Sequence, residues 1–196
     1  HVGFHRPVLP AAAQCAVEVD RVRHPRQPDL HEILLRVVQR ALAAALRSDA
    51  IDLEAEPCAV DNGAPWLVVR LKSADACIGL TPDPAALEAL TRRYGTDGLA
   101  VYAPHAEGGP TTFEIRCLMT GGSFGFGEDP VTGSANAALA GLLTRQERRP
   151  GQSYTARQGT AIGRDGRIFV SYDENGATWI GGHVVTVVDG TFLSPA

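Results

Sequence analysis

The residues best suited to chemistry lie in the segment 120–143, TGGSFGFGEDPVTGSANAALAGLL. An acid, Asp129, stands just before the Pro-x-Thr-Gly-Ser sequence that is expected to begin a helix. A helix N-terminus presents unpaired N–H groups and a partial positive charge. The amides of Gly133, Ser134 and Ala135 could therefore bind a substrate carboxylate or phosphate. Asp129 would then stand beside the bound anion, where a partly desolvated carboxyl group could act as a general acid or base.

A purely structural role explains the same residues. Asp and Ser are common helix caps, and either could serve here only to cap the helix. Glu128 could be a solvated neighbour or a hydrogen-bond anchor for the loop. Ser134 is not expected to be a nucleophile, because no histidine stands in a recognisable triad pattern with it. The residue types alone leave capping and catalysis both open.

The helix that would position this segment is predicted over Ser134–Leu143. Its residues are small or apolar almost all the way round, and only Asn136 interrupts them. A helix without a polar face must be surrounded by protein. The glycines that precede it, among them Gly127, allow the backbone to come close to a ligand.

The remaining elements are predicted from periodicity and turn signals. An amphipathic helix should follow Asp29, with Glu32 at capping-box spacing, and a second helix should run from Pro84 to about Arg93. Strands are expected within residues 1–28 and at 66–71, 99–103, 112–118, 167–172, 177–180 and 183–188. Strands dominate without a strict βαβ rhythm, so we expect an α+β fold.

Composition excludes several classes of protein. The formal net charge of −4 over 196 residues gives no basic patch of the kind that nucleic-acid binders show, and no apolar stretch approaches the ~20 residues that a membrane span needs. Four widely spaced cysteines without a C-x-x-C pair argue against a zinc site or a dense disulfide scaffold. We expect reduced thiols in a cytoplasmic protein, and no His/Asp cluster suggests a metal.

The string Glu128-Asp129-Pro130-x-Thr132-Gly133-Ser134-Ala135, followed by an Ala- and Leu-rich helix, resembles the signature of the PhzF-like (phenazine biosynthesis-like) isomerase family. Weaker matches are Val60-Asp61-Asn62-Gly63, Arg116, Gln158-Gly159 and Gly181-Gly182. The resemblance covers residues 57–196 well and residues 1–56 only loosely. We expect 57–196 to be a C-terminal epimerase-like half, and 1–56 a remnant of the first half with a linker helix.

The resemblance implies a diaminopimelate-epimerase-like fold, in which each of two halves wraps a curved sheet around a central helix, here Ser134–Leu143. It further implies cofactor-free isomerisation or epimerisation of a small carboxylate-bearing metabolite, with Asp129 as the catalytic residue. Thr132, Asn62 and Gly63 join the anion-binding residues as substrate contacts. Members are typically homodimers. Relatives that use a cysteine base carry it where this chain has Asp129, so Cys58 and Cys117 are expected to be core residues.

The departures from the family pattern are equally specific. Neither the catalytic Glu in a Ser-Glu-Thr context nor the Gly-His-Pro-Thr motif of the family's first half is found. Three interpretations follow: a fragment, a chain whose other half is a separate polypeptide, or a reduced homologue. The alternative function is a non-catalytic anion-binding module or an inactive fragment. Of the other polar residues, Arg164 is a candidate contact for a substrate anion, and His105 is expected to be exposed. His183 could face the site, but we expect a satisfied or exposed strand histidine there.

Overall fold

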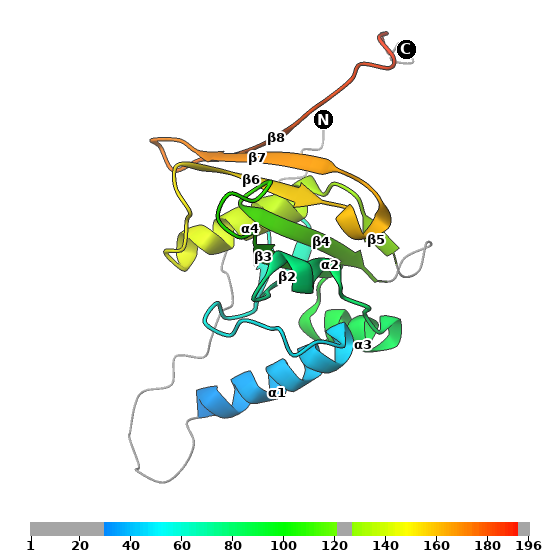
Figure 1. Cartoon of the computed structure of the whole chain (residues 1–196), viewed down its shortest axis with the longest axis vertical. Helices are drawn as coiled ribbons and strands as arrows, with labels where there is room; N and C mark the ends of the chain where they lie inside the picture. Colours follow the sequence, from blue (N-terminus) through cyan, green and yellow to red (C-terminus); the bar gives the residue numbers. More distant parts are fainter. Residues whose placement is uncertain (1–29, 121–126, 192–196) are drawn as a thin grey trace, which may run out of the picture.

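The computed structural model describes residues 30–120 and 127–191, and in this part of the chain one mixed sheet of eight strands is the main element (Figure 1). Its strand order is β1-β2-β3-β4-β6-β7-β8, and the short β5 pairs with β4. The strands are β1 (Cys58–Asp61), β2 (Pro65–Arg70), β3 (Gly98–Pro104), β4 (Phe113–Met119), β5 (Gly127–Asp129), β6 (Ser153–Gln158), β7 (Gly166–Tyr172) and β8 (Thr178–Gly182). The strand expected within residues 1–28 and the cap Asp29 lie outside the described residues.

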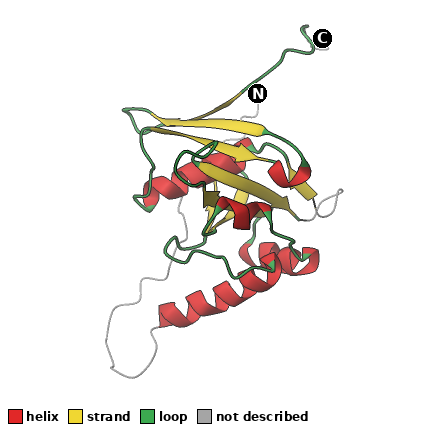
Figure 2. Ribbon diagram, in the orientation of Figure 1, coloured by secondary structure: helices red, strands yellow, loops and turns green. Residues whose placement is uncertain are grey.

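Four α-helices accompany the sheet in the described residues: α1 (Leu30–Leu46), α2 (Ala74–Ile78), α3 (Pro84–Tyr94) and α4 (Gly133–Arg145). Strands β2 and β3 pair in parallel, as do β4 and β6, whereas the other pairs are antiparallel. The mixture of short helices and a mixed sheet confirms the α+β prediction (Figure 2).

The sheet curls around α4. This helix contacts β1, β2 and β3 at one end of the strand order and β8 at the other (Figure 1). Strand alternation sends one set of side chains toward α4 and the next toward the opposite face. In β2, for example, Trp66 and Val68 belong to the core around α4, while Leu67 and Val69 belong to a second core beneath α1, α2 and α3.

The central helix is confirmed, with one correction. It begins at Gly133 and ends at Arg145, so it is longer than the predicted 134–143. Most of its apolar residues are buried, but Gly141 is exposed and Ala137 only partly buried. The sheet therefore surrounds the helix on all but one narrow stripe, which small residues line.

Local signals place α3 as expected. The Asp83 side chain accepts hydrogen bonds from the backbone N–H groups of Ala85 and Ala86, both at 3.1 Å, and Pro84 follows in the first turn. Gly95 ends the helix with φ +64°, a left-handed conformation that glycine adopts without steric cost. The strands predicted near β2, β3, β4, β7 and β8 are also found within a few residues of their predicted bounds.

One predicted strand is wrong, and three strands and one α-helix were missed. Residues 183–188 form no regular structure, and Val184, Val185, Val187 and Val188 are exposed, because in the described residues no strand pairs with them. Strands β1 and β5 have few residues, and β6 (SYTARQ) has too few large apolar residues to stand out. Helix α2 has only five residues, capped by the Ser73 hydroxyl, which accepts from the Ala76 N–H.

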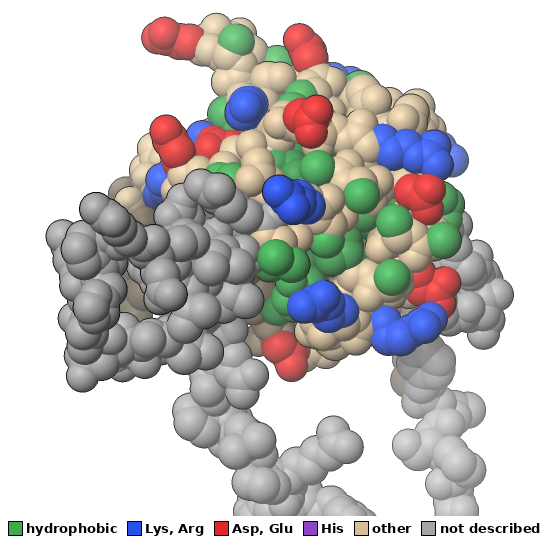
Figure 3. All heavy atoms as spheres, turned by 90° about the horizontal axis from the view of Figure 1, so that it is seen from below, with side chains coloured by type: hydrophobic (Ala, Val, Ile, Leu, Met, Phe, Trp, Pro, Cys, Tyr) green, Lys and Arg blue, Asp and Glu red, His purple; other side chains and the backbone are tan. Residues whose placement is uncertain are grey.

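The described cysteines differ in state. Cys77 and Cys117 are free and buried, whereas Cys58 is buried but disulfide-bonded, so the expectation of reduced thiols is wrong at Cys58. No helix in the described part of the chain is long and apolar enough to cross a bilayer. On the face seen from below, basic and acidic side chains lie interspersed among hydrophobic ones (Figure 3).

Candidate functional site

Asp129 ends β5, a short strand that pairs antiparallel with β4 and places Asp129 opposite Cys117. Its side chain is partly buried, and its Oδ1 accepts a hydrogen bond from the Val131 N–H at 3.1 Å. Aspartate side chains often accept such a hydrogen bond from the backbone N–H two residues further along the chain. It fixes the direction of the carboxylate immediately before α4 begins at Gly133.

The Glu128 side chain anchors β5 through hydrogen bonds and is not exposed to solvent. Its two carboxylate oxygens accept from Nε of Arg116 at 3.1 Å, and Oε2 accepts from Nη2 at 2.7 Å. Both side chains are nearly inaccessible, at 8% exposure for Arg116 and 6% for Glu128. The Nη1 group of Arg116 donates to the backbone carbonyl of Leu80 at 2.8 Å. The pair thereby ties β5 to β4 and to the end of α2.

A buried amide joins β5 to the start of α4. Gln158, which is 0% exposed, donates from Nε2 to the Asp129 carbonyl at 2.7 Å and to the Thr132 hydroxyl at 2.8 Å. Its Oε1 accepts from the Thr132 N–H at 3.2 Å and from Asn136 Nδ2 at 3.1 Å. The acid and the helix N-terminus are thus held by one side chain. The sequence suggested no such role for Gln158, although the lone Asn136 on an apolar helix signalled that a buried amide must find a partner.

The first turn of α4 has the expected open character. Thr132 is the N-cap residue but makes no side-chain cap hydrogen bond, and Asn136 N, which bonds to the Thr132 carbonyl at 3.2 Å, makes the first helical contact. Gly133 is exposed and Ser134 half-buried, whereas Ala135 is buried in the core. An anion could therefore approach the amides of Gly133 and Ser134 most directly.

The Asn62–Gly63 turn lies against the same helix end. Asn62 Nδ2 donates to the Ser134 carbonyl at 2.9 Å, although 72 residues separate the two. Trp66 Nε1 donates to Ser134 Oγ at 3.1 Å, so the hydroxyl hydrogen of Ser134 stays available to an acceptor. Gly63 has φ +102°, which explains glycine at this position. The structure thus brings Asn62, Ser134, Thr132 and Asp129 to one end of α4.

Two glycines let the segment after Asp129 pack closely on β6 and β7. A Cβ on Gly166 would lie 2.7 Å from the Pro130 carbonyl oxygen and would also collide with Val131. A Cβ on Gly159 would lie 3.0 Å from the same oxygen. These close approaches fix Pro130 between the acid and the helix, and they give Gly166 a positional role that the sequence did not reveal.

Cys117, which pairs with Asp129 across β4 and β5, is an alternative acid or base, and it is poorly suited to either role. Burial raises the pKa of its thiol to about 12, although a hydrogen bond with Thr132 opposes the shift. The neutral thiol is therefore the stable form near pH 7. A buried thiol of this kind is structural and inert, which agrees with the expectation that Cys117 is a core residue.

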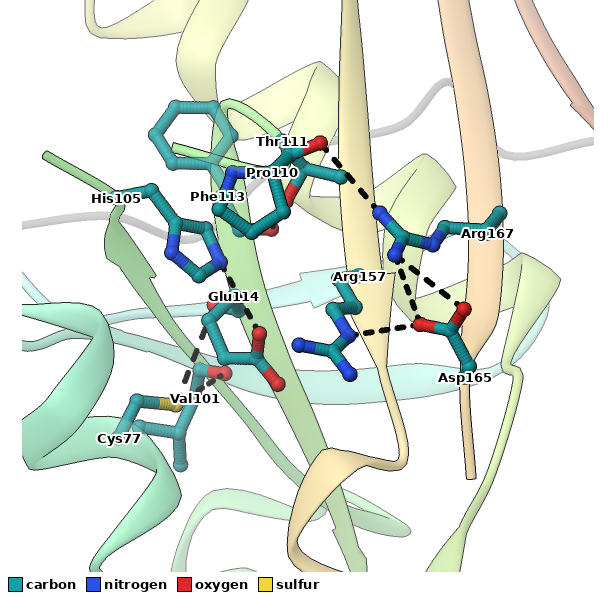
Figure 4. Close-up of polar contacts among 10 residues, drawn as sticks. All are labelled: Cys77, Val101, His105, Pro110, Thr111, Phe113, Glu114, Arg157, Asp165 and Arg167. Carbon is teal, nitrogen blue, oxygen red and sulfur yellow. Dashed lines mark hydrogen bonds and ion pairs between the residues drawn. The ribbon is translucent and has the colours of Figure 1, made fainter. Parts of the chain in front are cut away.

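The sequence also drew attention to His105, His183 and Arg164. His105 is not exposed as expected: its side chain is 10% accessible, and its Nε2 lies 3.1 Å from Oε2 of the fully buried Glu114 (Figure 4). His183 is exposed, as expected, and its ring packs edge-on against Phe169. Arg164 is exposed as well, and its backbone N–H bonds to the Gly159 carbonyl at 2.8 Å. Within residues 30–120 and 127–191, no group of three or more His, Cys, Asp or Glu side chains is arranged to hold a metal ion.

The sequence matches the phenazine biosynthesis-like protein family (PhzC-PhzF) over residues 10–190. The chain therefore belongs to this family. An uncharacterized isomerase from Deinococcus radiodurans is 33% identical over 163 residues, which cover 78% of this chain and 51% of the relative. The chain spans about half the length of the curated relatives it matches.

Solved structures define the fold. A phenazine biosynthesis protein of the PhzF family from Bacillus anthracis superposes with a TM-score of 0.59 at 19% identity, covering 72% of this chain and 50% of the other. A predicted epimerase from Pseudomonas aeruginosa superposes with a TM-score of 0.58 at 23% identity, covering 75% and 49%. The described residues thus have the diaminopimelate-epimerase-like arrangement that the sequence predicted, a curled sheet around a central helix.

Proposed function

We propose that this chain supplies one side of the active site of an isomerase or epimerase that moves a proton on a small carboxylic acid. Asp129 is the proton-transferring residue, and the first turn of α4 binds the substrate carboxylate. The observation that carries the proposal is the buried amide of Gln158, which bonds both to the Asp129 carbonyl and to Thr132 at the helix start. A catalytic acid and an anion site gain from such fixed mutual positions.

The chemistry needs no redox step. The Asp129 carboxylate takes a proton from the carbon next to the substrate carboxylate, and the electron pair of the C–H bond is delocalised into that group. The N–H groups of Gly133 and Ser134, with the Ser134 hydroxyl, stabilise the added negative charge. A proton returned to the opposite face gives the epimer, and one returned to a conjugated carbon gives a double-bond isomer.

A second proton-transferring group must come from elsewhere. Glu128, the acid beside Asp129, is bound to Arg116 through both oxygens and is nearly inaccessible. We therefore propose that the second group belongs to the other half of the active site, contributed by another segment of a longer chain, by a separate polypeptide or by a second copy of this chain. A small carboxylic acid is the proposed partner of the site.

Conversion assays test this function. The protein is incubated with a panel of chiral and unsaturated carboxylic acids, and the isomers are followed by chiral chromatography. We expect at least one acid to be converted by the wild type, and Asp129→Asn to lower that rate by at least about 100-fold. The matched control is Asp165→Asn, which alters an exposed acid paired with Arg157 and should leave the rate unchanged. Equal rates in wild type and Asp129→Asn would exclude Asp129 as the catalytic residue.

A non-catalytic anion-binding module is the second candidate, and the commitment of Glu128 to Arg116 favours it. Such a module would keep the anion-binding amides in the first turn of α4 and would lack a second acid or base. Calorimetry distinguishes the two: binding of dicarboxylates or aromatic acids without any conversion supports the module. No heat of binding at millimolar ligand would count against both functions.

A further inference from the structure

A hollow of about 290 Å³ opens near the end of α4 that lies opposite Asp129. Its lining is Arg70, Tyr102, Phe113, Leu143, Arg148 and Arg149. Leu143 belongs to the last turns of α4, and Arg148 and Arg149 follow the helix. At a rise of about 1.5 Å per residue, the helix separates this hollow from the Asp129 end by about 18 Å. The hollow is therefore distinct from the candidate site at Asp129.

The hollow carries an excess of positive charge. Arg70 Nη1 pairs with Asp52 at 3.2 Å, so one guanidinium is neutralised. Arg148 Nη2 donates to the Glu54 backbone carbonyl, and Arg149 Nε donates to the Thr144 hydroxyl at 2.8 Å. Both of these acceptors are uncharged. The exposed guanidinium groups of Arg148 and Arg149 therefore line the hollow, and each keeps further N–H donors available because a guanidinium carries five N–H groups.

The Tyr102 hydroxyl supplies the second, independent sign of a ligand. Tyr102 is 2% exposed, and its hydroxyl has no hydrogen-bond partner among the described residues. Burial raises its pKa to about 12, while the positive charges of Arg70 and Arg148 act in the opposite direction. The hydroxyl therefore stays protonated and can donate. A buried hydroxyl without a partner is costly, so an acceptor in the hollow would remove that cost.

The rest of the wall is apolar. Phe113 and Leu143 are 6% and 2% exposed, and the Phe113 ring packs edge-on against Tyr102 with centroids 5.5 Å apart. Arginine forks match the two oxygens of a carboxylate, and aromatic and aliphatic walls accept a hydrocarbon body. The volume admits only a small molecule.

We propose that this hollow is a second ligand site, which binds a small carboxylate with an aromatic or aliphatic body. The carboxylate lies between the guanidinium groups of Arg148 and Arg149 and accepts from the Tyr102 hydroxyl. The hydrocarbon part packs on Phe113 and Leu143. The site does not depend on Asp129 or on catalysis.

Benzoate is the probe, and benzamide, its uncharged isostere, is the ligand control. Binding is measured by NMR titration of the protein, following the Nε–H signals of Arg70, Arg148 and Arg149 and, separately, the amides of Gly133 and Ser134. We expect benzoate to shift the arginine signals and to bind at least about tenfold more tightly than benzamide, since hydrogen bonds to a charged group are the stronger ones.

Variants identify the site. Arg148→Gln and Tyr102→Phe should each weaken the benzoate binding seen at the arginine signals about five- to tenfold. The control Arg93→Gln, at an exposed arginine on α3, should not change it. Circular dichroism checks each fold, and the wild-type shifts decide alone if a variant does not fold.

Three results would overturn the proposal. The first is no shift of the arginine signals at about 10 mM benzoate, far above the dissociation constant expected of a functional site. The second is a shift of the Gly133 and Ser134 amides alone, which would place benzoate at the other end of α4. The third is inorganic phosphate binding as tightly as benzoate, because a site that reads only charge would make no use of Phe113 and Leu143.

Discussion

Gln158 Nε2 donates to the carbonyl oxygen of Asp129 at 2.7 Å, and this contact crosses 29 residues of chain. The contact joins the last residue of β6 to the last residue of β5. The same amide group also holds Thr132, so the acid and the start of α4 cannot move independently without breaking buried hydrogen bonds.

Replacing Gln158 by leucine should destabilise the protein strongly. The change removes four hydrogen bonds and takes the Gln158 partner away from the Asp129 carbonyl and from the Thr132 N–H, while Asn136 Nδ2 keeps only its bond to the Thr132 carbonyl. We expect the free energy of unfolding, measured in urea, to fall by about 2–4 kcal/mol. Gln152→Leu, at an exposed glutamine, is the control and should change it by less than about 0.5 kcal/mol. Similar losses for both variants would contradict the role of the Gln158 network.

The Arg116–Glu128 pair gives a second test. Arg116→Met leaves the Glu128 carboxylate buried without its partner, and removing one member of a buried pair costs about 3–5 kcal/mol. The control is Arg92→Met, which breaks the exposed pair with Glu88 and should cost less than about 1 kcal/mol. If urea unfolding shows equal costs, the buried pair does not anchor β5.

Glycine substitutions should act in opposite directions at two sites. Gly166→Ala places a methyl group against the Pro130 carbonyl, and we expect a loss of about 1–3 kcal/mol in unfolding free energy with weaker substrate binding. Gly141→Ala meets nothing within 4 Å on an exposed part of α4 and should stabilise by about 0.5–1 kcal/mol. Thermal melting of both variants is the measurement. A stabilised Gly166→Ala protein would show that Pro130 is not tightly packed.

The Cys117 thiol should be unreactive in the folded protein. Burial raises its pKa to about 12, so the folded state favours the neutral thiol. The corresponding stability is fully present below the pKa of the unfolded thiol and is lost as the pH rises toward 12. Iodoacetamide at pH 8 should label Cys117 in urea and leave it unlabelled without urea, as judged by mass spectrometry of peptides. Rapid labelling of the native protein would make Cys117 a candidate base after all.

Sequence patterns predicted the elements whose signals are local. Asp83-Pro84 and Gly95 fixed both ends of α3, and the small apolar run after Ser134 predicted the central helix. The strand predicted at 183–188 is wrong, because a valine-rich run shows only that the residues favour a strand, and strand pairing depends on a partner that is distant in the sequence. The same limit applies to the site. The sequence pointed to Asp129 and the α4 amides, but the amide of Gln158 and the fit of Gly166 on Pro130 depend on contacts between remote segments.

In the proposed function, Asp129 transfers a proton at carbon. The most direct measurement is deuterium incorporation from D₂O into a bound carboxylic acid, followed by proton NMR, with the affinity of the same acid measured by calorimetry. We expect exchange by the wild type and by Asp165→Asn. We also expect Asp129→Asn to bind the acid within about threefold of the wild type but to exchange at least about 100-fold more slowly. Undiminished exchange by Asp129→Asn would show that Asp129 does not transfer the proton.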